Sequence, residues 1–152
     1  AIGAMTGGGV VDEPIGRHPH NRQKMAVEPI HGKEAITHYR LIKRYNNHTH
    51  IRLKLETGRT HQIRVHMAHI QYPLVGDPQY AGRLKMPKGC SPELQEGLRG
   101  FRRQALHAKK LELSHPATGE WMEWEVDLPE DMLELIQILE MDLDNGGQNQ
   151  YM

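Results

Sequence analysis

The hydrophobic pattern changes period near residue 56, and this change constrains the fold of the middle of the chain. Over residues 50–56, apolar and charged residues alternate, which is typical of a strand with one buried face. Over residues 61–70, the apolar residues recur at helical spacing, namely Ile63, Met67 and Ile70. We therefore predict a strand, a tight connection and a helix, with Thr60 as the N-cap of that helix.

The same patterns predict the remaining elements. Residues 37–45 are rich in β-forming residues and form a hairpin with 50–56 across Asn46-Asn47. We expect a helix over 92–103, a second hairpin around a turn at 116–119, and a terminal helix opened by Pro129, with an apolar side made of Met132, Leu135, Ile136, Leu139 and Leu143.

This element order predicts an α+β fold, with a mixed, mainly antiparallel sheet and flanking helices. The predicted elements belong to a single domain over residues 1–143. Residues 144–152 are polar, so we predict a disordered tail there. Residues 1–34 lack periodicity and are rich in Gly, Pro and basic residues, so we predict an irregular segment.

The net charge of zero conceals a separation of charge along the chain. Residues 115–152 hold ten of the 19 acidic side chains and no Lys or Arg, so the first 114 residues hold 19 basic against 9 acidic side chains. A positive body with an acidic end suits a polyanion-binding surface, because phosphate contacts release counterions. An uneven surface charge without a function explains the same numbers equally well.

Other features exclude some protein classes. No apolar run approaches the ~20 residues that a membrane-spanning helix needs, so we do not expect a membrane protein. Cys90 is the only cysteine, which excludes an internal disulfide and favours a reducing cytoplasm. The chain starts at Ala1 without a signal peptide or an initiating Met, as a fragment or a processed product would.

Residues 56–66 form the densest polar cluster, at the junction between a predicted strand and a predicted helix. Helix N-termini attract phosphate and carboxylate groups. Arg64 flanks the predicted core stripe, and a charge at the edge of a core needs a partner. No carboxylate stands next to Arg64 in sequence, so we expect its partner to come from elsewhere.

Two other interpretations of this cluster are a solvated helix start and a metal site. His61, His66 and His69 are crowded, but His61 and His66 are five residues apart, and no acidic residue accompanies the pair His66 and His69. The i, i+4 pair with an intervening Glu that zinc proteases use is absent. We therefore predict no metal.

The run Gly58-Arg59-Thr60-His61-Gln62-Ile63-Arg64-Val65-His66, followed by residues 73–77, resembles the RluA/RluD family of pseudouridine synthases. Residues 106–108, 115–116 and 122–135 are similar to the closing segment of that family. Residues 16–19, 24–27 and 35–39 are similar to its RluD-like branch. The resemblance covers residues 1–143 in order and implies the pseudouridine synthase fold.

The resemblance implies isomerisation of uridine to pseudouridine in large-subunit ribosomal RNA, on a flipped nucleotide and without a cofactor. The arginine at the position of Arg64 would form an ion pair with the catalytic Asp. The expected RNA-binding residues are Arg17, Arg22, Lys24, Arg59, Thr60, His61 and Gln62, with further contacts from Lys85 to Lys88.

The chain departs from the family pattern in one important respect. The catalytic Asp of the family lies in a motif close to G-R-L-D-x-x-T-S-G, and neither Asp12 nor Asp77 has that context. The stacking Tyr and the S4-like RNA-binding module are also missing. We expect a C-terminal piece of the catalytic domain that is inactive alone and that self-associates through surfaces left uncovered. An RNA-binding module without turnover and a purely structural domain are the alternatives.

Overall fold

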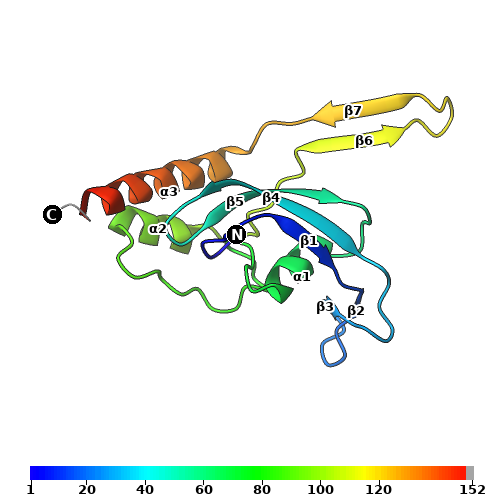
Figure 1. Cartoon of the computed structure of the whole chain (residues 1–152), viewed down its shortest axis with the longest axis horizontal. Helices are drawn as coiled ribbons and strands as arrows, with labels where there is room; N and C mark the ends of the chain where they lie inside the picture. The colour runs from blue at the N-terminus through cyan, green and yellow to red at the C-terminus, as the bar shows by residue number, and fades with distance from the viewer. Residues whose placement is uncertain (150–152) are drawn as a thin grey trace.

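The computed structural model describes the backbone of residues 1–149 and the side chains of residues 1–144. Seven strands form three separate antiparallel sheets, accompanied by three helices (Figure 1). This arrangement confirms the predicted α+β class with antiparallel pairing. The elements in chain order are β1 (Gly9–Asp12), β2 (Ile15–Arg17), β3 (Met25–Val27), β4 (Ile36–Arg44), β5 (Thr49–Leu55), α1 (Gln62–His69), α2 (Pro92–Gly100), β6 (Lys110–Ser114), β7 (Trp121–Glu125) and α3 (Glu130–Asn149).

The central sheet has the strand order β1-β4-β5. The hairpin β4–β5 was predicted from the sequence, and its register places Leu41 opposite Ile51. These two residues pack with Tyr39 and Leu53 around the buried side chains Met5, Met67 and Leu74. Since Met67 belongs to α1, this helix covers one face of the sheet (Figure 1).

The prediction that residues 1–34 are irregular is wrong, because they contain β1, β2 and β3. β1 pairs with β4 at the edge of the central sheet. Just before β1, Gly8 lets the two backbones approach each other closely. A Cβ on Gly8 would lie 2.6 Å from the carbonyl oxygen of Tyr39. The hairpin β2–β3 packs on α1 from another side, where Ile15, Ala35 and Val65 form a second buried cluster.

This double packing corrects the predicted core stripe of α1. Met67 is fully buried, but Ile63 and Ile70 are only half-buried. The buried positions of the helix also include Gln62, Arg64 and His66, because α1 contacts polar groups as well as the sheet. The predicted N-cap is also wrong. His61 occupies the cap position with a φ of 55° and makes no side-chain cap, and helix α1 spans only eight residues.

Helices α2 and α3 form a third packed region with Val75, Phe101 and Tyr45. Asp142 of α3 accepts a hydrogen bond from the backbone N–H of Ser91 at 2.7 Å and another from the Asn46 side chain at 3.4 Å. It therefore ties the β4–β5 turn to both helices. We predicted a disordered tail from residue 144, but α3 continues to Asn149. Residues 150–152 lie outside the described residues.

The second predicted hairpin, β6–β7, is also present and extends away from the rest of the chain (Figure 1). Its apolar face pairs Leu111 with Trp124 and Leu113 with Met122. Leu111 is 56% exposed and Trp124 is 45% exposed, so no other described element covers this face. None of the helices in the described part of the chain is long and apolar enough to cross a membrane.

Candidate functional site

A buried polar network fixes the start of α1 against the central sheet. The side-chain oxygen of Gln62 accepts hydrogen bonds from the Thr57 hydroxyl and the Arg59 backbone N–H, at 2.7 and 3.0 Å. Its amide nitrogen donates to the carbonyl oxygen of Ile36 and to the Thr37 hydroxyl. Gln62 is 2% exposed and uses its full hydrogen-bonding capacity, so the prediction that it contacts RNA is wrong.

His66 extends this network to the N-terminal segment. One ring nitrogen lies 2.8 Å from the Thr37 hydroxyl and the other lies 2.8 Å from the carbonyl oxygen of Glu13. Burial lowers the pKa of His66, and the ring is fully enclosed. Both nitrogens of this histidine hold α1 in place, which leaves neither of them for a ligand.

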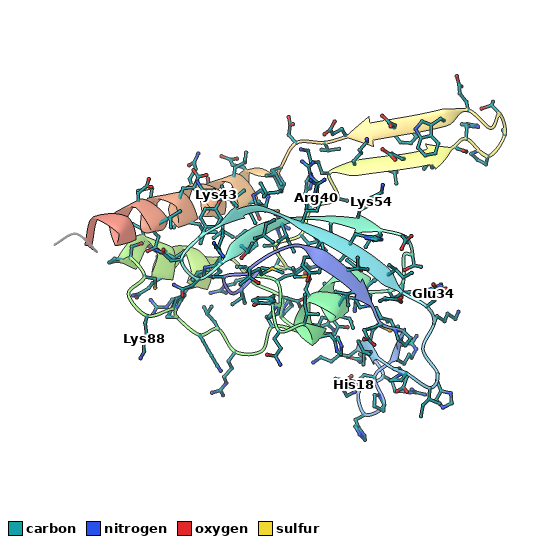
Figure 2. All side chains as sticks on the ribbon, in the orientation of Figure 1. His18, Glu34, Arg40, Lys43, Lys54 and Lys88 are labelled. Carbon is teal, nitrogen blue, oxygen red and sulfur yellow. The ribbon has the colours of Figure 1, made fainter. Side chains whose placement is uncertain are left out.

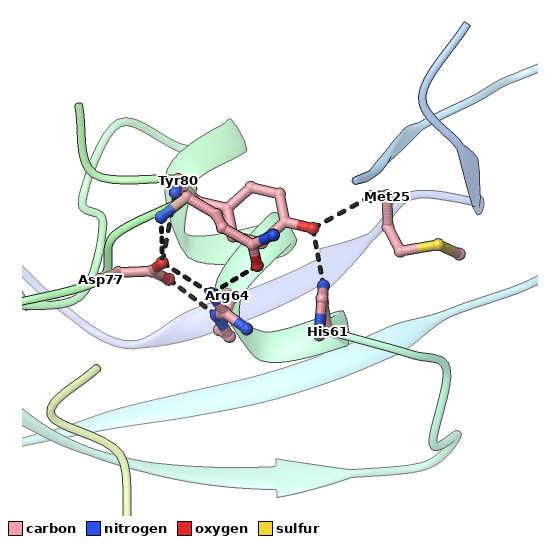
Figure 3. Close-up of polar contacts among 6 residues, drawn as sticks. Met25, His61, Arg64, Asp77 and Tyr80 are labelled. Carbon is pink, nitrogen blue, oxygen red and sulfur yellow. Dashed lines mark hydrogen bonds and ion pairs between the residues drawn. The ribbon is translucent and has the colours of Figure 1, made fainter. Parts of the chain in front are cut away.

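Arg64 has a carboxylate partner within the described residues, although none stands next to it in sequence. Its Nε donates to one oxygen of Asp77 at 2.9 Å, and its Nη2 donates to the other at 2.8 Å (Figure 3). Nη2 also donates to the Gln79 side chain at 2.9 Å. Such a two-point contact orients both planar groups.

The 76–80 turn is arranged around the Asp77 carboxylate, which is fully buried. One oxygen of Asp77 also accepts hydrogen bonds from the backbone N–H groups of Gln79 and Tyr80. Burial would raise the pKa of Asp77, but the hydrogen bonds from Arg64 and these backbone groups outweigh burial and lower it. The hydrogen bond to Asp77 in turn raises the pKa of Arg64. Both groups are therefore charged at neutral pH.

Arg64 keeps one free edge. Nε has its single hydrogen on Asp77, and Nη2 shares its two between Asp77 and Gln79. Among the described residues, Nη1 has no hydrogen-bond partner, and it is not among the buried polar atoms that lack one. Two N–H donors of a fixed guanidinium are therefore available to a further anion.

Tyr80 joins this ion pair to His61 (Figure 3) and to Lys24, two residues predicted to bind RNA. The Arg64 guanidinium lies 5.0 Å from the centre of its ring, and the Lys24 ammonium lies 5.6 Å from it. The Tyr80 hydroxyl lies 2.8 Å from a ring nitrogen of His61 and accepts a hydrogen bond from the Met25 backbone N–H. The structure thus brings Lys24, His61 and Arg64 together around one aromatic ring.

The other predicted RNA-binding residues lie outside this group. Arg17 and Arg22 stand at the tip of the β2–β3 hairpin, where the Arg17 side chain donates to the Arg22 carbonyl oxygen. They line a shallow, open cleft with Pro19, Glu28 and His31. Thr60 and Arg59 are exposed beside the start of α1, and Arg59 Nε donates to the Glu34 carbonyl oxygen.

Sequence reasoning missed Asp77, Gln79 and Tyr80 as parts of this site. A local signal existed, because an Asp followed by Pro is typical of a turn in which the carboxylate accepts backbone N–H bonds. The pattern could have identified the turn at Asp77. It could not have placed that turn beside Arg64, since thirteen residues separate the two.

Comparisons with known proteins agree with the resemblance. The family model described as RNA pseudouridylate synthase matches residues 4–69. The chain is 58% identical over 142 residues to ribosomal large subunit pseudouridine synthase D of Pasteurella multocida, and 60% identical over 141 residues to the protein of that name from Pseudomonas aeruginosa. Each of these matches covers 93% of the chain and 44% of the relative.

A solved structure shares the fold. Human RNA pseudouridylate synthase domain containing 4 superposes with a TM-score of 0.70 at 23% identity, over 91% of this chain and 59% of that one. At this identity the likeness concerns the fold alone. The chain spans less than half the length of the curated relatives that it matches. By its sequence, the chain belongs to the RluA/RluD family of pseudouridine synthases.

Proposed function

We propose that this chain takes part in converting uridine to pseudouridine in large-subunit ribosomal RNA, as one portion of a pseudouridine synthase. In this reaction the uracil base leaves the ribose through N1 and is rejoined through C5. The names of the relatives, ribosomal large subunit pseudouridine synthase D, support this class of substrate. Ribosomal RNA and the single cysteine favour a cytoplasmic location.

The observation that carries the proposal is that the Arg64 guanidinium uses only its Nε and Nη2 donors within the described residues. Asp77 and Gln79 fix the Nε and Nη2 side, and the Nη1 side is left for a second carboxylate. That carboxylate is the catalytic Asp that the family resemblance implies, from a segment outside these 152 residues. A guanidinium within hydrogen-bond distance would orient this acid and keep it ionised at neutral pH.

The surrounding residues suit RNA. Lys24 and His61 flank the Tyr80 ring beside Arg64, and Arg17, Arg22 and Arg59 add exposed cations at the β2–β3 hairpin and before α1. In this proposal their charges hold the phosphates near the flipped uridine and offset the cost of unstacking it. No metal or cofactor is part of the proposed reaction. Within residues 1–144, no group of three or more His, Cys, Asp or Glu side chains is placed to hold a metal ion.

The proposal is tested in a protein that joins this chain to the upstream portion that its relatives have. Pseudouridine formation is followed as loss of hydrogen from uracil C5 in an RNA fragment. We expect Arg64→Ala to lower kcat by about 100-fold or more and to change the RNA Kd by less than about threefold. Arg99→Ala removes an exposed arginine outside the site and serves as the control. Turnover by Arg64→Ala at the wild-type rate would contradict the proposal.

A second candidate is an RNA-binding fragment without chemistry. The exposed cations of the β2–β3 loop and Arg59 favour it, because they lie on the chain itself and need no missing acid. The 152-residue chain would then bind RNA with a steep salt dependence and would form no pseudouridine. Turnover by the longer protein separates this candidate from the first.

A further inference from the structure

The outward face of the central sheet carries a group of cations that the proposed site does not use. Tyr39, Leu41, Ile51 and Leu53 point toward α1, so the alternate residues of these two strands point the other way. Those outward positions hold His38 and Arg40 in β4, and His50, Arg52 and Lys54 in β5. A register shift after Leu41 places Lys43 opposite His50. Figure 2 shows Arg40 and Lys54 on the side of the sheet opposite α1.

The charges at the centre of this face are not neutralised. Arg40 lies directly opposite Arg52 in the β4–β5 register, and neither has an ion pair within residues 1–144. Like charges in directly opposed positions of a ladder destabilise it. Carboxylates do accompany the neighbours of this pair: Glu56 pairs with His38, Glu140 with Lys43, and Glu112 lies near Lys54.

The electrostatic surroundings of His50 indicate a positive potential on the same face. Burial lowers the pKa of His50, and the nearby charges of Arg52 and Lys109 lower it further. An uncompensated cationic face attracts anions. Its exposed arginines have the geometry to donate two parallel hydrogen bonds to a phosphate.

The shape of the face distinguishes between classes of nucleic acid. His38 and Lys43 are five positions apart along β4, which corresponds to about 17 Å at the usual rise of a strand. The outward residues of β4 and β5 include no Phe, Tyr or Trp, so bases have no stacking platform of that kind. A flat cationic face of this kind fits a duplex, whose backbone is recognised through phosphates and shape.

We propose that Arg40, Arg52 and Lys54 form a second RNA-binding surface, which takes the phosphate backbone of a double-stranded RNA segment. This inference rests on the proposed function in its choice of RNA as the polyanion. The surface lies across the sheet from α1 and is therefore separate from Arg64 and Tyr80. Its role is to hold a helical region of the substrate RNA while a uridine elsewhere occupies the site.

The test uses the 152-residue chain and a labelled RNA duplex of mixed sequence, with binding measured by fluorescence anisotropy between 50 and 200 mM KCl. We expect Arg40→Gln with Arg52→Gln to reduce the magnitude of the slope of log K against log salt by about 1.8, and to weaken binding about tenfold at 50 mM KCl. Loss of the opposed arginines does not threaten the fold, since they repel each other. Circular dichroism verifies this.

Two controls make the result specific. Arg99→Gln with Arg102→Gln removes the same charge from exposed positions at the end of α2, and we expect duplex affinity within about twofold of wild type. Lys24→Gln with Arg59→Gln reports on the proposed site. If that variant loses RNA binding while Arg40→Gln with Arg52→Gln keeps it, the second surface is refuted and the proposed function stands. Equal competition by poly-glutamate and by duplex RNA at equal charge would also overturn the inference.

Discussion

The two long hairpins have the same sequence pattern and very different surroundings. In β4–β5, Leu41 and Ile51 lie on the face of the sheet that α1 covers. In β6–β7, Leu111 and Trp124 are paired in the same way, and their face is exposed. Alternation in a sequence therefore predicts a strand with an apolar face. It does not tell which other element, if any, covers that face.

The polar contacts of the two hairpins also differ in burial. The first hairpin is joined to α1 by buried hydrogen bonds through Thr37, Gln62 and His66, and α1 carries the buried Arg64–Asp77 pair. The second hairpin has only exposed ion pairs, such as Lys110–Glu123. Surface pairs contribute little to stability, whereas breaking a buried pair leaves an uncompensated charge. We therefore expect substitutions in the first region to have much larger effects.

The largest effect is expected from Asp77→Ala. This substitution leaves the buried Arg64 guanidinium without a carboxylate, and it removes the acceptor of two backbone N–H groups. We expect the free energy of unfolding to fall by about 3–5 kcal/mol in urea titrations. Asp131→Ala breaks the exposed pair with Arg103 and should lower the free energy of unfolding far less than Asp77→Ala does, because solvent screens a surface pair. Equal effects of the two substitutions would contradict the contrast between regions.

A comparably large effect is expected from acid, through two buried basic groups beside the start of β5. Burial lowers the pKa of the Ala1 amino group to about 5 and that of His48 to about 4. Since both groups bind protons more readily when unfolded, stability is lost as pH falls from 8 toward 5 and from 6.5 toward 4, respectively. His48 alone should account for about 3 kcal/mol over its range.

The pH dependence can be separated into its two sources by thermal melts between pH 8 and pH 4. His48→Gln should remove the loss below pH 6.5 that belongs to the ring. Acetylation of Ala1 keeps an N–H for the Thr49 carbonyl oxygen and removes the loss between pH 8 and pH 5. A melting temperature that is constant from pH 8 to pH 4 would refute both assignments.

Tyr80→Phe should have an intermediate effect. It removes the acceptor of the Met25 N–H and the contact with His61, and we expect a loss of about 1–2 kcal/mol together with faster hydrogen exchange at Met25. Tyr72→Phe is the matched control, because the Tyr72 hydroxyl has no hydrogen bond to any described side chain or backbone group. Unchanged exchange at Met25 would show that Tyr80 does not hold the β2–β3 hairpin.

The smallest effect on stability is expected in the second hairpin. Leu111→Gln with Trp124→Gln changes two exposed side chains, so the free energy of unfolding should change by less than about 0.5 kcal/mol. We propose that the chain self-associates through this uncovered apolar face. Light scattering should then show a shift toward monomer in the double variant. A wild-type chain that is already monomeric at high concentration would exclude this self-association.

Periodicity predicted both hairpins and all three helices, because these elements follow from patterns within short windows. It failed for β1, β2 and β3, which have only three or four residues each and depend on pairing with distant partners. The site was predicted only in part, because some of its contacts also depend on residues that are distant in sequence. Arg64 stands out by its position beside a core stripe, but its partner Asp77 is brought to it only by the turn after α1. Gln62 has the same polarity as an RNA-binding residue, and only the fold shows that it is buried.

We propose that Asp77 holds one edge of Arg64 so that the other edge meets the catalytic acid. The most direct test is the kcat of Asp77→Asn in the longer protein, at a temperature where circular dichroism shows the variant to be folded. We expect a fall of about tenfold or more in kcat, with RNA affinity within about twofold of wild type. A folded Asp77→Asn enzyme with wild-type kcat would contradict this role of Asp77.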